Sequence, residues 1–533
     1  MGTCIVIGSG PAGVSAAYAL VGKGHRVVML DAGLQLEPER ARAVEALSTV
    51  PPSDWDARLL APLKEGVEVT SQGIPLKRSY GSDYPFRIRE AAYEIERDDV
   101  DIAPSFALGG LSTVWGSGIL PFCDCDMADW PISASDLAEH YRALFSFMPC
   151  AAARDDLERH FPLYTEQIAD LRPSRQAALF FRDVERRRES LEQGGITVGR
   201  TRLAVDPAGD DRWRKPHCAY CGLCLYGCPY RLIYNCQSTV VELRERPGFS
   251  YRPNVIVERI EETGGVVVVH GREWIGGAEV RVVGDKAFIG AGTLPTTAIV
   301  LRSLEVFDRP VKIQDSMYFL LPMIRFRGVR GVADEHLHTL SQALIIIQDK
   351  MICDEYICFS LYTYNDLLEP VLRKSGGPLG KTFGRLWHDL ASRTFILGGY
   401  LHSRHSPHIN MILRKKGQNG RTTIRLEGIP NPISRRMARK AGLKLLCHTY
   451  DFKGLPVLPF MRFSPPGRGF HCGGSFPMRS IAQPGSSDRL GRPYGLSSVH
   501  IVDAASFPSI PATPITLPIM ANAHRIASEA VEG

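Results

Sequence analysis

The hydrophobic pattern of the first thirty residues changes twice. Residues 3–7 form a short apolar run, residues 14–20 carry apolar side chains at helical spacing, and residues 26–30 form a second apolar run. A short unbroken apolar run is typical of a strand buried in a parallel sheet, and a helix between two such strands makes a βαβ unit. The pattern therefore predicts a strand, a helix and a strand in that order.

Strands and helices continue to alternate farther along the chain. Strands are expected at 255–257, 265–270, 281–283, 287–292, 318–326, 343–348, 356–361 and 499–502. Helices are expected over 137–144, from Leu294 or Pro295 onward, and over 517–531, with Ser133 or Ser135 as the N-cap of the first. This alternation predicts the α/β class with a parallel sheet.

The junction between the first strand and the first helix carries three glycines. Gly8, Gly10 and Gly13 match the spacing G-x-G-x-x-G, and Asp31 ends the second strand. The first glycine permits a tight turn, the second lets the backbone approach a pyrophosphate, and the third lets helix and strand pack closely. The free N–H groups of the helix and an acid for the ribose complete a dinucleotide site. This turn alone does not separate NAD from FAD.

Composition and charge exclude several classes of protein. The 533 residues are 44% hydrophobic and 23% charged, which is ordinary for a water-soluble protein of more than one domain. A formal net charge of +6 is small for this length and does not indicate nucleic-acid binding. The sequence contains no signal peptide pattern and no apolar stretch of transmembrane length, so we expect a cytoplasmic location.

Four of the thirteen cysteines fall within eleven residues. Cys218, Cys221, Cys224 and Cys228, followed by proline, have the spacing C-x2-C-x2-C-x3-C-P, which is the pattern of bacterial ferredoxins. The fourth cysteine of that pattern ligates another cluster in ferredoxins, so Cys236 is a further candidate here. An iron–sulfur cluster ([4Fe–4S] or [3Fe–4S]), a zinc site and a loop of structural thiols all remain open.

Further motifs lie near both ends of the chain. Besides the glycine turn they are Gly109-Gly110-Leu-Ser112-Thr113, Trp130-Pro-Ile-Ser, Gly290-Ala-Gly-Thr-Leu, His471-x-x-Gly474-Ser475-x-x-Met478, Asp503-Ala-Ala-Ser-Phe-Pro and Pro514-Ile-Thr516-Leu-Pro-Ile-Met520-Ala-Asn522-Ala. In this order and spacing they resemble the glucose–methanol–choline (GMC) oxidoreductases, a family of FAD-dependent enzymes that oxidise alcohols. The resemblance is strong at the ends and weak in the middle, and it is closest to the pyranose-oxidising branch.

The resemblance implies a catalytic base and a set of FAD-binding residues. His471 would take the hydroxyl proton, and Thr513, where the family usually has His or Asn, would orient the substrate oxygen. Some pyranose-oxidising relatives bind FAD covalently through a histidine whose matching position here is Val114, so we expect non-covalent FAD. The residues implied at FAD are Gly8, Gly10, Pro11, Ala12, Gly13, Asp31, Ala32, Gly109, Gly110, Ser112, Thr113, Val114, Val257, Gly290, Ala291, Asp503, Ala504, Pro514, Ile515 and Thr516.

These observations lead to one predicted organisation and function. A discontinuous Rossmann-type FAD domain would comprise 1–150, 200–304 and 466–533, with a cysteine-rich insert at 217–236, and a β-sheet-based substrate domain would comprise 305–465. The chain would oxidise an alcohol of a sugar, polyol or glycosylated metabolite and pass electrons to an acceptor protein or to dioxygen. The alternatives are an oxidase of a hydrophobic or steroid-type alcohol, a non-catalytic flavin-binding relay, and a nicotinamide-using reductase, which lacks a second complete glycine motif.

Overall fold

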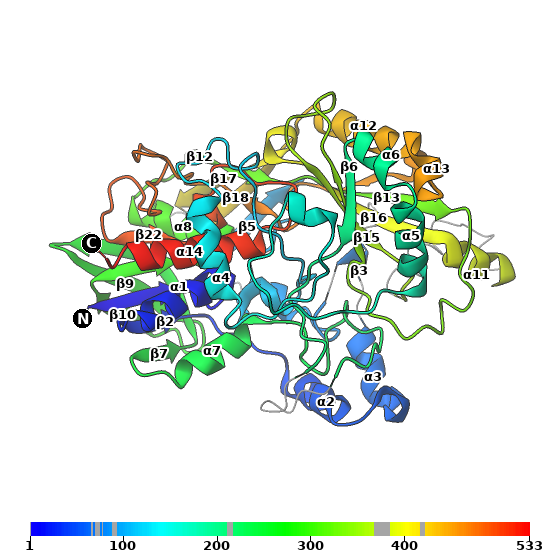
Figure 1. Ribbon diagram of the computed structural model, residues 1–533. Helices are drawn as coiled ribbons and strands as arrows, with labels where there is room; N and C mark the ends of the chain where they lie inside the picture. The colour runs from blue at the N-terminus through cyan, green and yellow to red at the C-terminus, as the bar shows by residue number, and fades with distance from the viewer. Residues whose placement is uncertain are drawn as a thin grey trace.

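A computed structural model describes residues 2–65, 68–69, 75–76, 78–87, 93–209, 217–366, 384–415 and 422–532. Figure 1 shows two groups of strands side by side, one with both chain termini and the other flanked by the helices α5, α6, α12 and α13. Each group is built around its own sheet, and the functional site is formed where the two sheets face each other.

The first sheet has five parallel strands in the order β22-β11-β1-β2-β7. Their bounds are Val499–Ile501, Lys286–Ile289, Thr3–Ile7, Arg26–Leu30 and Phe249–Arg252. Successive β1 side chains enter different cores: Val6 joins the core beneath the helices, and Ile5 and Ile7 join the core on the opposite face. Burial on both faces explains the unbroken apolar runs, and the pattern predicted β1, β2, β11 and β22 at these places.

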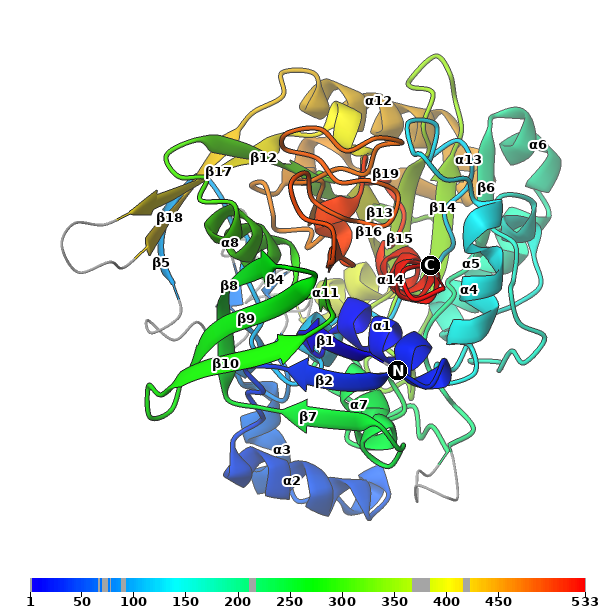
Figure 2. The same cartoon turned by 90° about the vertical axis from the view of Figure 1, so that its left-hand side faces the viewer.

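The two faces of the parallel sheet have different covers. One is packed by helices α1 (Pro11–Gly22), α14 (Thr516–Glu529), α4 (Ala138–Leu144) and α7 (Cys236–Arg244). The other faces an antiparallel sheet of β8 (Val255–Thr263), β9 (Val266–Glu273) and β10 (Glu279–Gly284), together with α8 (Thr293–Ser303). Figure 2 shows these three strands beside the parallel strands. This layered arrangement is an α/β fold of Rossmann type.

The second large sheet has seven strands and faces the first. Its order is β19-β13-β16-β15-β14-β6, and β20 also pairs with β13. The bounds are Gly454–Pro456 (β19), Tyr318–Arg325 (β13), Thr394–Tyr400 (β16), Ile357–Tyr362 (β15), Ala343–Ile347 (β14), Ile196–Arg200 (β6) and Arg462–Phe463 (β20). Side chains of one face pack under α5 (Arg175–Glu185), α6 (Arg188–Gln193), α12 (Ser434–Cys447) and α13 (Thr449–Phe452). The opposite face is left for the cavity.

A third sheet draws strands from distant parts of the chain. Its order is β21-β12-β17-β18-β5, with bounds Cys472–Gly473, Pro310–Asp315, His408–Lys415, Thr422–Ile429 and Glu94–Asp98. Both the N-terminal segment 1–150 and the C-terminal segment 466–533 therefore supply a strand to a sheet built mainly from 305–465. The domain boundaries stay a prediction.

The remaining described elements are short or peripheral. They are α2 (Pro38–Ser48), α3 (Ala57–Lys64), α11 (Gly384–Arg393), β3 (Glu68–Val69), β4 (Pro75–Leu76) and the 3-10 turns Pro52–Asp54, Tyr84–Phe86, Gly110–Thr113, Ser135–Leu137, Asp156–Arg159, Ser403–His405, Leu458–Phe460 and Ala504–Ser506. Within the described ranges, no helix combines the length and apolar character that a membrane crossing requires.

The predicted N-cap of α4 is wrong. The helix begins at Ala138 after a 3-10 turn, and neither Ser133 nor Ser135 caps it. The Asp136 carboxylate instead accepts hydrogen bonds from the backbone N–H and the Oγ of Ser133, both at 2.8 Å. Ser133 therefore donates its hydroxyl hydrogen to the Asp136 carboxylate and accepts no backbone N–H group of α4.

The seven-stranded sheet contains a close contact between Gly399 and the ring of Phe319, and a substitution can test it. A Cβ at Gly399 of β16 would lie 2.3 Å from the ring of Phe319, which is fully buried on the paired strand. Gly399→Ala should lower the free energy of unfolding by about 1–3 kcal/mol, because the ring has no space to move into. Urea unfolding followed by circular dichroism measures the change.

Gly22→Ala is the matched control. Gly22 is exposed at the end of α1, and a Cβ there would meet no atom within 4 Å. This replacement should leave stability unchanged or raise it by about 0.5 kcal/mol through reduced freedom of the unfolded chain. Equal effects of the two substitutions would contradict the packing described for β16.

Candidate dinucleotide and active site

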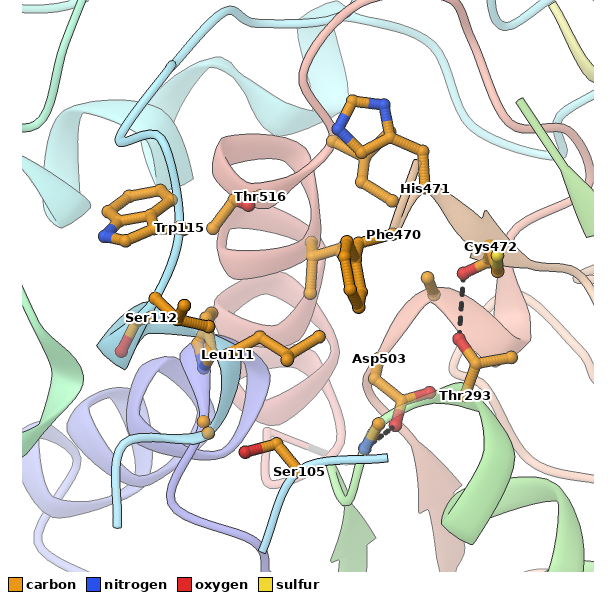
Figure 3. A pocket seen from close by; sticks show the side chains of 18 of the residues that line it. Ser105, Leu111, Ser112, Trp115, Thr293, Phe470, His471, Cys472, Asp503 and Thr516 are labelled. Atoms are coloured by element: carbon orange, nitrogen blue, oxygen red, sulfur yellow. Dashed lines mark hydrogen bonds between the residues drawn. The ribbon is translucent and has the colours of Figure 1, made fainter. Parts of the chain in front are cut away.

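A cavity of about 430 Å³ lies between the parallel sheet and the seven-stranded sheet. Figure 3 shows side chains from the glycine-rich loop, α14 and the segment before β21 turned toward this space. Of the residues implied at the cofactor, those that line the cavity are Gly8, Gly10, Pro11, Ala12, Asp31, Ala32, Gly110, Ser112, Val114, Val257, Gly290, Ala291, Asp503, Ala504, Pro514, Ile515 and Thr516. Gly13, Gly109 and Thr113 do not line it.

The glycine turn forms a cradle that side chains would fill. Gly8 has φ +97°, and a Cβ there would lie 2.5 Å from the carbonyl oxygen of Gly290. A Cβ at Gly13 would lie 1.9 Å from the carbonyl oxygen of Gly8, so Gly13 is required for the packing of α1 on β1. No side chain caps α1 at Gly10. The first-turn N–H groups are thus left for an anion, as a pyrophosphate requires.

Asp31 is buried at the end of β2 and lines the same cavity. Its Oδ2 accepts hydrogen bonds from Ser9 Oγ at 2.6 Å and from the Tyr251 hydroxyl at 3.0 Å. Burial raises the pKa of this carboxyl to about 6, and the two hydroxyl donors oppose the shift. Ser9 also accepts the backbone N–H of Gly109 at 2.9 Å, which ties the acid to the glycine-rich loop. The binding of a ribose hydroxyl by this acid stays a prediction.

A second buried acid stands at the N-terminus of α8. Asp503 accepts the backbone N–H of Gly292 at 2.8 Å and that of Ala505 at 2.9 Å, and Thr296 Oγ1 donates to it as well. Burial raises the pKa of Asp503 to about 6 against the effect of these donors. The acid joins the C-terminal segment to the strand-turn-helix at β11 and α8, which closes one side of the cavity (Figure 3).

The glycine-rich loop is held by neighbours rather than by a regular element. Gly109 has φ +89°, and a Cβ there would lie 2.5 Å from the side chain of Asn235. Ser112 Oγ donates to the carbonyl oxygen of Gly109 at 2.6 Å and accepts the backbone N–H of Cys236 at 2.9 Å. The loop therefore presents Ser112 and Val114 to the cavity. Val114 has no atom that could form a covalent bond to a flavin.

His471 lines the cavity directly before β21, as Figure 3 shows. Its ring stacks on Tyr400 of β16 with centroids 4.6 Å apart, and its Nδ1 is buried without a hydrogen-bond partner. Burial lowers the pKa of the imidazole to about 4, so the ring is neutral near pH 7. The preceding residue, Phe470, has φ 57°, a conformation that non-glycine residues adopt at a cost and that often marks a functional site. A neutral imidazole facing a cavity is suited to accept a proton.

Thr513 is placed differently from the cavity residues that follow it. It is fully buried, its Oγ1 has no hydrogen-bond partner, and it is not part of the cavity wall. Pro514, Ile515 and Thr516 do line the cavity. Its role in orienting a substrate stays a prediction, and the unpartnered hydroxyl is the observation that keeps this role open.

Cys218, Cys221, Cys224 and Cys228 of the segment 217–236 lie close together beside the cavity. Burial raises the pKa of the Cys224 thiol, and the neighbouring thiols of Cys221, Cys228 and Cys218 add to the effect. Cys236 is not among these neighbours; it begins α7 against Ser112. Leu225, beside Cys224, lines the cavity.

The spacing of these thiols bears on the choice of metal. Tetrahedral zinc would hold thiolate sulfurs about 3.8 Å apart. In the part of the chain that the structure describes, the groups of three or more ligand atoms within 4.8 Å are Cys123, Cys125 and Asp126, and Cys353, Glu355 and His405. The ferredoxin-like cysteines do not form such a group. A multi-iron cluster binds each thiolate to a different iron and holds the sulfurs farther apart than one zinc ion does.

Three residues of the cavity wall had no sequence signal. Tyr400 belongs to β16, Ser117 follows the glycine-rich loop, and Arg202 follows β6. Ser117 Oγ and two nitrogens of Arg202 are buried without hydrogen-bond partners. These residues are scattered in sequence, and only the pairing of distant strands brings them to one cavity.

Comparisons with known proteins agree with this geometry at the level of the fold. The structure is similar to the crystal structure of pyridoxine 4-oxidase from Mesorbium loti, with a TM-score of 0.60 and 14% sequence identity, covering 100% of this chain and 99% of that one. The two chains share a fold, and this supports a GMC-like fold without indicating the pyranose branch. No protein-family model and no curated protein matches the sequence.

The glycine cradle makes a prediction that separates folding from cofactor binding. A Cβ at Gly10 would meet only Gly110 Cα, at an ordinary 3.7 Å, so the FAD-free Gly10→Ala protein should keep its stability within about 0.5 kcal/mol. The same methyl group would occupy the place where the backbone must approach a pyrophosphate, and FAD binding should be largely lost. Fluorescence titration of the FAD-free protein with FAD measures it.

Gly13→Ala is the paired comparison. Its methyl group would overlap the carbonyl oxygen of Gly8, so the FAD-free protein should lose about 1–3 kcal/mol of stability. Undiminished FAD binding by Gly10→Ala would show that the turn does not hold a pyrophosphate.

Proposed function

We propose that this chain is an FAD-dependent oxidoreductase that oxidises an alcohol group to a carbonyl, with His471 as the base. The observation that carries the proposal is the neutral His471 imidazole in the wall of a cavity that also holds the glycine cradle. The fold shared with pyridoxine 4-oxidase supports the same reaction class. The fold, the cradle and the base together favour an enzyme over a non-catalytic relay.

The proposed reaction divides the work between the chain and its cofactor. The hydroxyl proton passes to the His471 imidazole while the carbinol C–H bond breaks and a C=O bond forms. FAD, when bound, supplies the acceptor for the hydride. The stacked Tyr400 ring fixes the orientation of His471, and Thr513 is proposed to help orient the substrate oxygen. Val114 supports non-covalent FAD.

The cavity wall supports a polar substrate. The side of the seven-stranded sheet that faces the cavity alternates apolar residues with side chains that bear hydroxyls. The apolar residues are Leu320, Leu344, Cys358 and Ile396, and the hydroxyls are on Tyr318, Ser360, Tyr362 and Tyr400. Aromatic rings with polar tips suit a sugar, polyol or glycosylated metabolite better than a steroid-type alcohol, which would be matched by a wholly apolar wall. We therefore propose a sugar, polyol or glycosylated metabolite as the substrate, with the hydrophobic or steroid-type alcohol as the alternative.

We further propose that Cys218, Cys221, Cys224 and Cys228 bind an iron–sulfur cluster of the [4Fe–4S] or [3Fe–4S] type. Convergence of their thiols and the ferredoxin spacing support this site. The segment is joined to the glycine-rich loop through residues 79 and 80. The Tyr80 hydroxyl donates to the carbonyl oxygen of Cys228 at 2.9 Å, and Ser79 Oγ donates to that of Thr113 at 3.0 Å. When bound, a cluster supplies one-electron transfer. An acceptor protein would then be favoured over dioxygen.

His471 gives a prediction for activity and pH. His471→Ala should lower kcat by roughly 100- to 10,000-fold, because the proton acceptor is lost, while FAD stays bound. Since burial lowers the pKa of His471, the neutral form is present above about pH 4, and the acid limb of kcat/KM should fall below pH 6.5. A panel of sugar, polyol and steroid alcohols with an artificial electron acceptor provides the assay.

His500→Gln is the matched control for that variant. His500 is more deeply buried than His471 and also has a pKa lowered to about 4 by burial, but it stacks on Phe288 outside the cavity wall. It should keep near-normal turnover per bound FAD. Near-normal turnover of His471→Ala would contradict the assignment of His471 as the base. Absence of turnover across the panel in the FAD-loaded wild type would favour the non-catalytic flavin-binding relay.

The cluster has its own prediction. Anaerobic purification should yield flavin bands together with a broad absorption near 400 nm that bleaches on reduction, and about three to four iron atoms per chain. Cys224→Ser should lose iron and keep FAD, whereas Cys447→Ser, which changes an exposed cysteine of α12, should keep both. Iron-free protein after reconstitution with iron and sulfide would exclude the cluster.

A further inference from the structure

Arg202 is a buried cation without an acidic partner. Its side chain is 2% exposed, and Nη1 donates to the carbonyl oxygens of Phe161 and, at 3.4 Å, Pro162. Nε and Nη2 are buried with no hydrogen-bond partner. The nearest acid, Asp155, acts on Arg202 only through charge, and its two oxygens accept the backbone N–H groups of Leu157 and Arg200. A buried charge without a partner is among the least favourable arrangements in a protein, so its persistence points to a missing ligand.

The other buried arginines of the described chain show what is missing. Arg325 pairs with Asp183, Arg468 pairs with Asp101 at 3.0 Å, and Arg525 pairs with Glu529 at 3.2 Å. Each of these three has a carboxylate of the chain against its guanidinium group. Arg202 is buried to the same degree and has only two carbonyl oxygens.

Arg202 lines the cavity where the segment after the glycine-rich loop runs beside the segment after β6. The backbone N–H of Ile119 donates to the carbonyl oxygen of Arg202 at 2.9 Å, and that of Ala204 donates to the carbonyl oxygen of Ser117 at 2.8 Å. These two bonds hold Ser117 beside the arginine. Ser117 lines the cavity too, its Oγ is buried without a partner, and its φ is 52°. Two unsatisfied polar side chains, one on strained backbone, therefore occupy neighbouring positions.

The unpartnered nitrogens define the geometry of the ligand. Nε and Nη2 carry parallel N–H bonds along one edge of the guanidinium plane, and this edge matches the two oxygens of a carboxylate or phosphate. Nη1, the nitrogen that is already bonded, belongs to the other edge. The arginine is thus anchored through Nη1, and its Nε–Nη2 edge has no partner in the chain.

Strand order separates this edge from the catalytic histidine. His471 stacks on Tyr400 of β16, and the sheet runs from β16 through β15 and β14 to β6, after which Arg202 follows. Three gaps between neighbouring strands amount to about 14 Å across the sheet, and Arg202 is displaced along the strand as well, because Thr197 is the β6 residue level with Tyr400. Tyr400, Cys358 and Leu344 line the cavity along this path. The histidine and the arginine stand at opposite ends of one wall.

We infer that Arg202 and Ser117 form a recognition site for an anionic oxygen group, a carboxylate or a phosphate, on the substrate of this enzyme. That this anion belongs to a substrate rests on the proposed alcohol oxidation, whereas anion binding at Arg202 does not. The substrate class becomes an acidic alcohol whose anionic group is held at Arg202 while its hydroxyl approaches His471. A sugar acid or a sugar phosphate has this character.

The test uses ligands that cannot be oxidised. Calorimetric titration of the FAD-loaded protein with benzoate, phenyl phosphate and neutral benzamide compares charge at nearly constant shape. The wild type should bind one of the two anions roughly 10- to 100-fold more tightly than benzamide. The stronger of the two anions distinguishes a carboxylate from a phosphate substrate. Equal binding of anions and benzamide would overturn the inference without use of any variant.

Variants locate the site. Arg202→Met should reduce the anion preference to within about twofold, and Ser117→Ala should reduce it partly. Arg200→Met is the matched control, because Arg200 is two residues away and pairs with Asp170 instead; it should keep the preference. A preference that survives Arg202→Met would overturn the inference.

One further outcome would assign Arg202 to the flavin. If Arg202→Met keeps the anion preference but changes the flavin spectrum and lowers its reduction potential, the guanidinium group contacts the flavin ring oxygen rather than the substrate. Turnover of 4-(hydroxymethyl)benzoate is measured separately. Anion preference without turnover of any alcohol would leave the Arg202 site standing and remove the proposed oxidation.

Discussion

The close approach of three backbone segments at the glycine turn is the constraint on which the rest of the site depends. Gly13 brings α1 against the carbonyl oxygen of Gly8, and Gly8 in turn lies against Gly290 after β11. No side chain larger than hydrogen fits at these contacts. Since β1, α1 and β11 meet there, the carboxyl end of the parallel sheet has a single geometry, and the cavity opens from it.

The half of the cavity beside His471 follows from the alternation of side chains in the seven-stranded sheet. Phe319, Phe359 and Leu397 point to the face covered by helices, and their neighbours in sequence point to the cavity. Paired residues such as Tyr400 and Cys358 share a face because antiparallel neighbours are in register. A one-residue shift would exchange the helix-covered core face with the cavity face, so hydrophobic packing beneath the sheet determines which side chains line the cavity.

Local pattern was sufficient to predict four of the five parallel strands, because each depends on a short apolar run; β7, with the half-exposed sequence Phe249–Arg252, was missed. The position of His471 in the cavity wall agrees with its motif. The N-cap of α4 was missed because Asp136 competes for the serine. Arg202 could not have been found: β6 pairs with β14, nearly 150 residues later in the chain, and an isolated arginine after a strand is usually exposed. Arg202 is distinctive because its Nε and Nη2 have no hydrogen-bond partner, and only the three-dimensional structure shows this.

The order of the chain has a consequence for how the protein is made. β1 and α1 are synthesised first, yet their sheet neighbour β11, the edge strand β22 and the covering helix α14 come from residues 286 and beyond. Asp503 and His471 also belong to the last part of the chain. A nascent chain on the ribosome therefore exposes the apolar face of α1 until residues 516–529 have been synthesised. Since Gly290 and Asp503 belong to the cavity wall, the cavity is completed only at that stage, and the chain is open to aggregation until then.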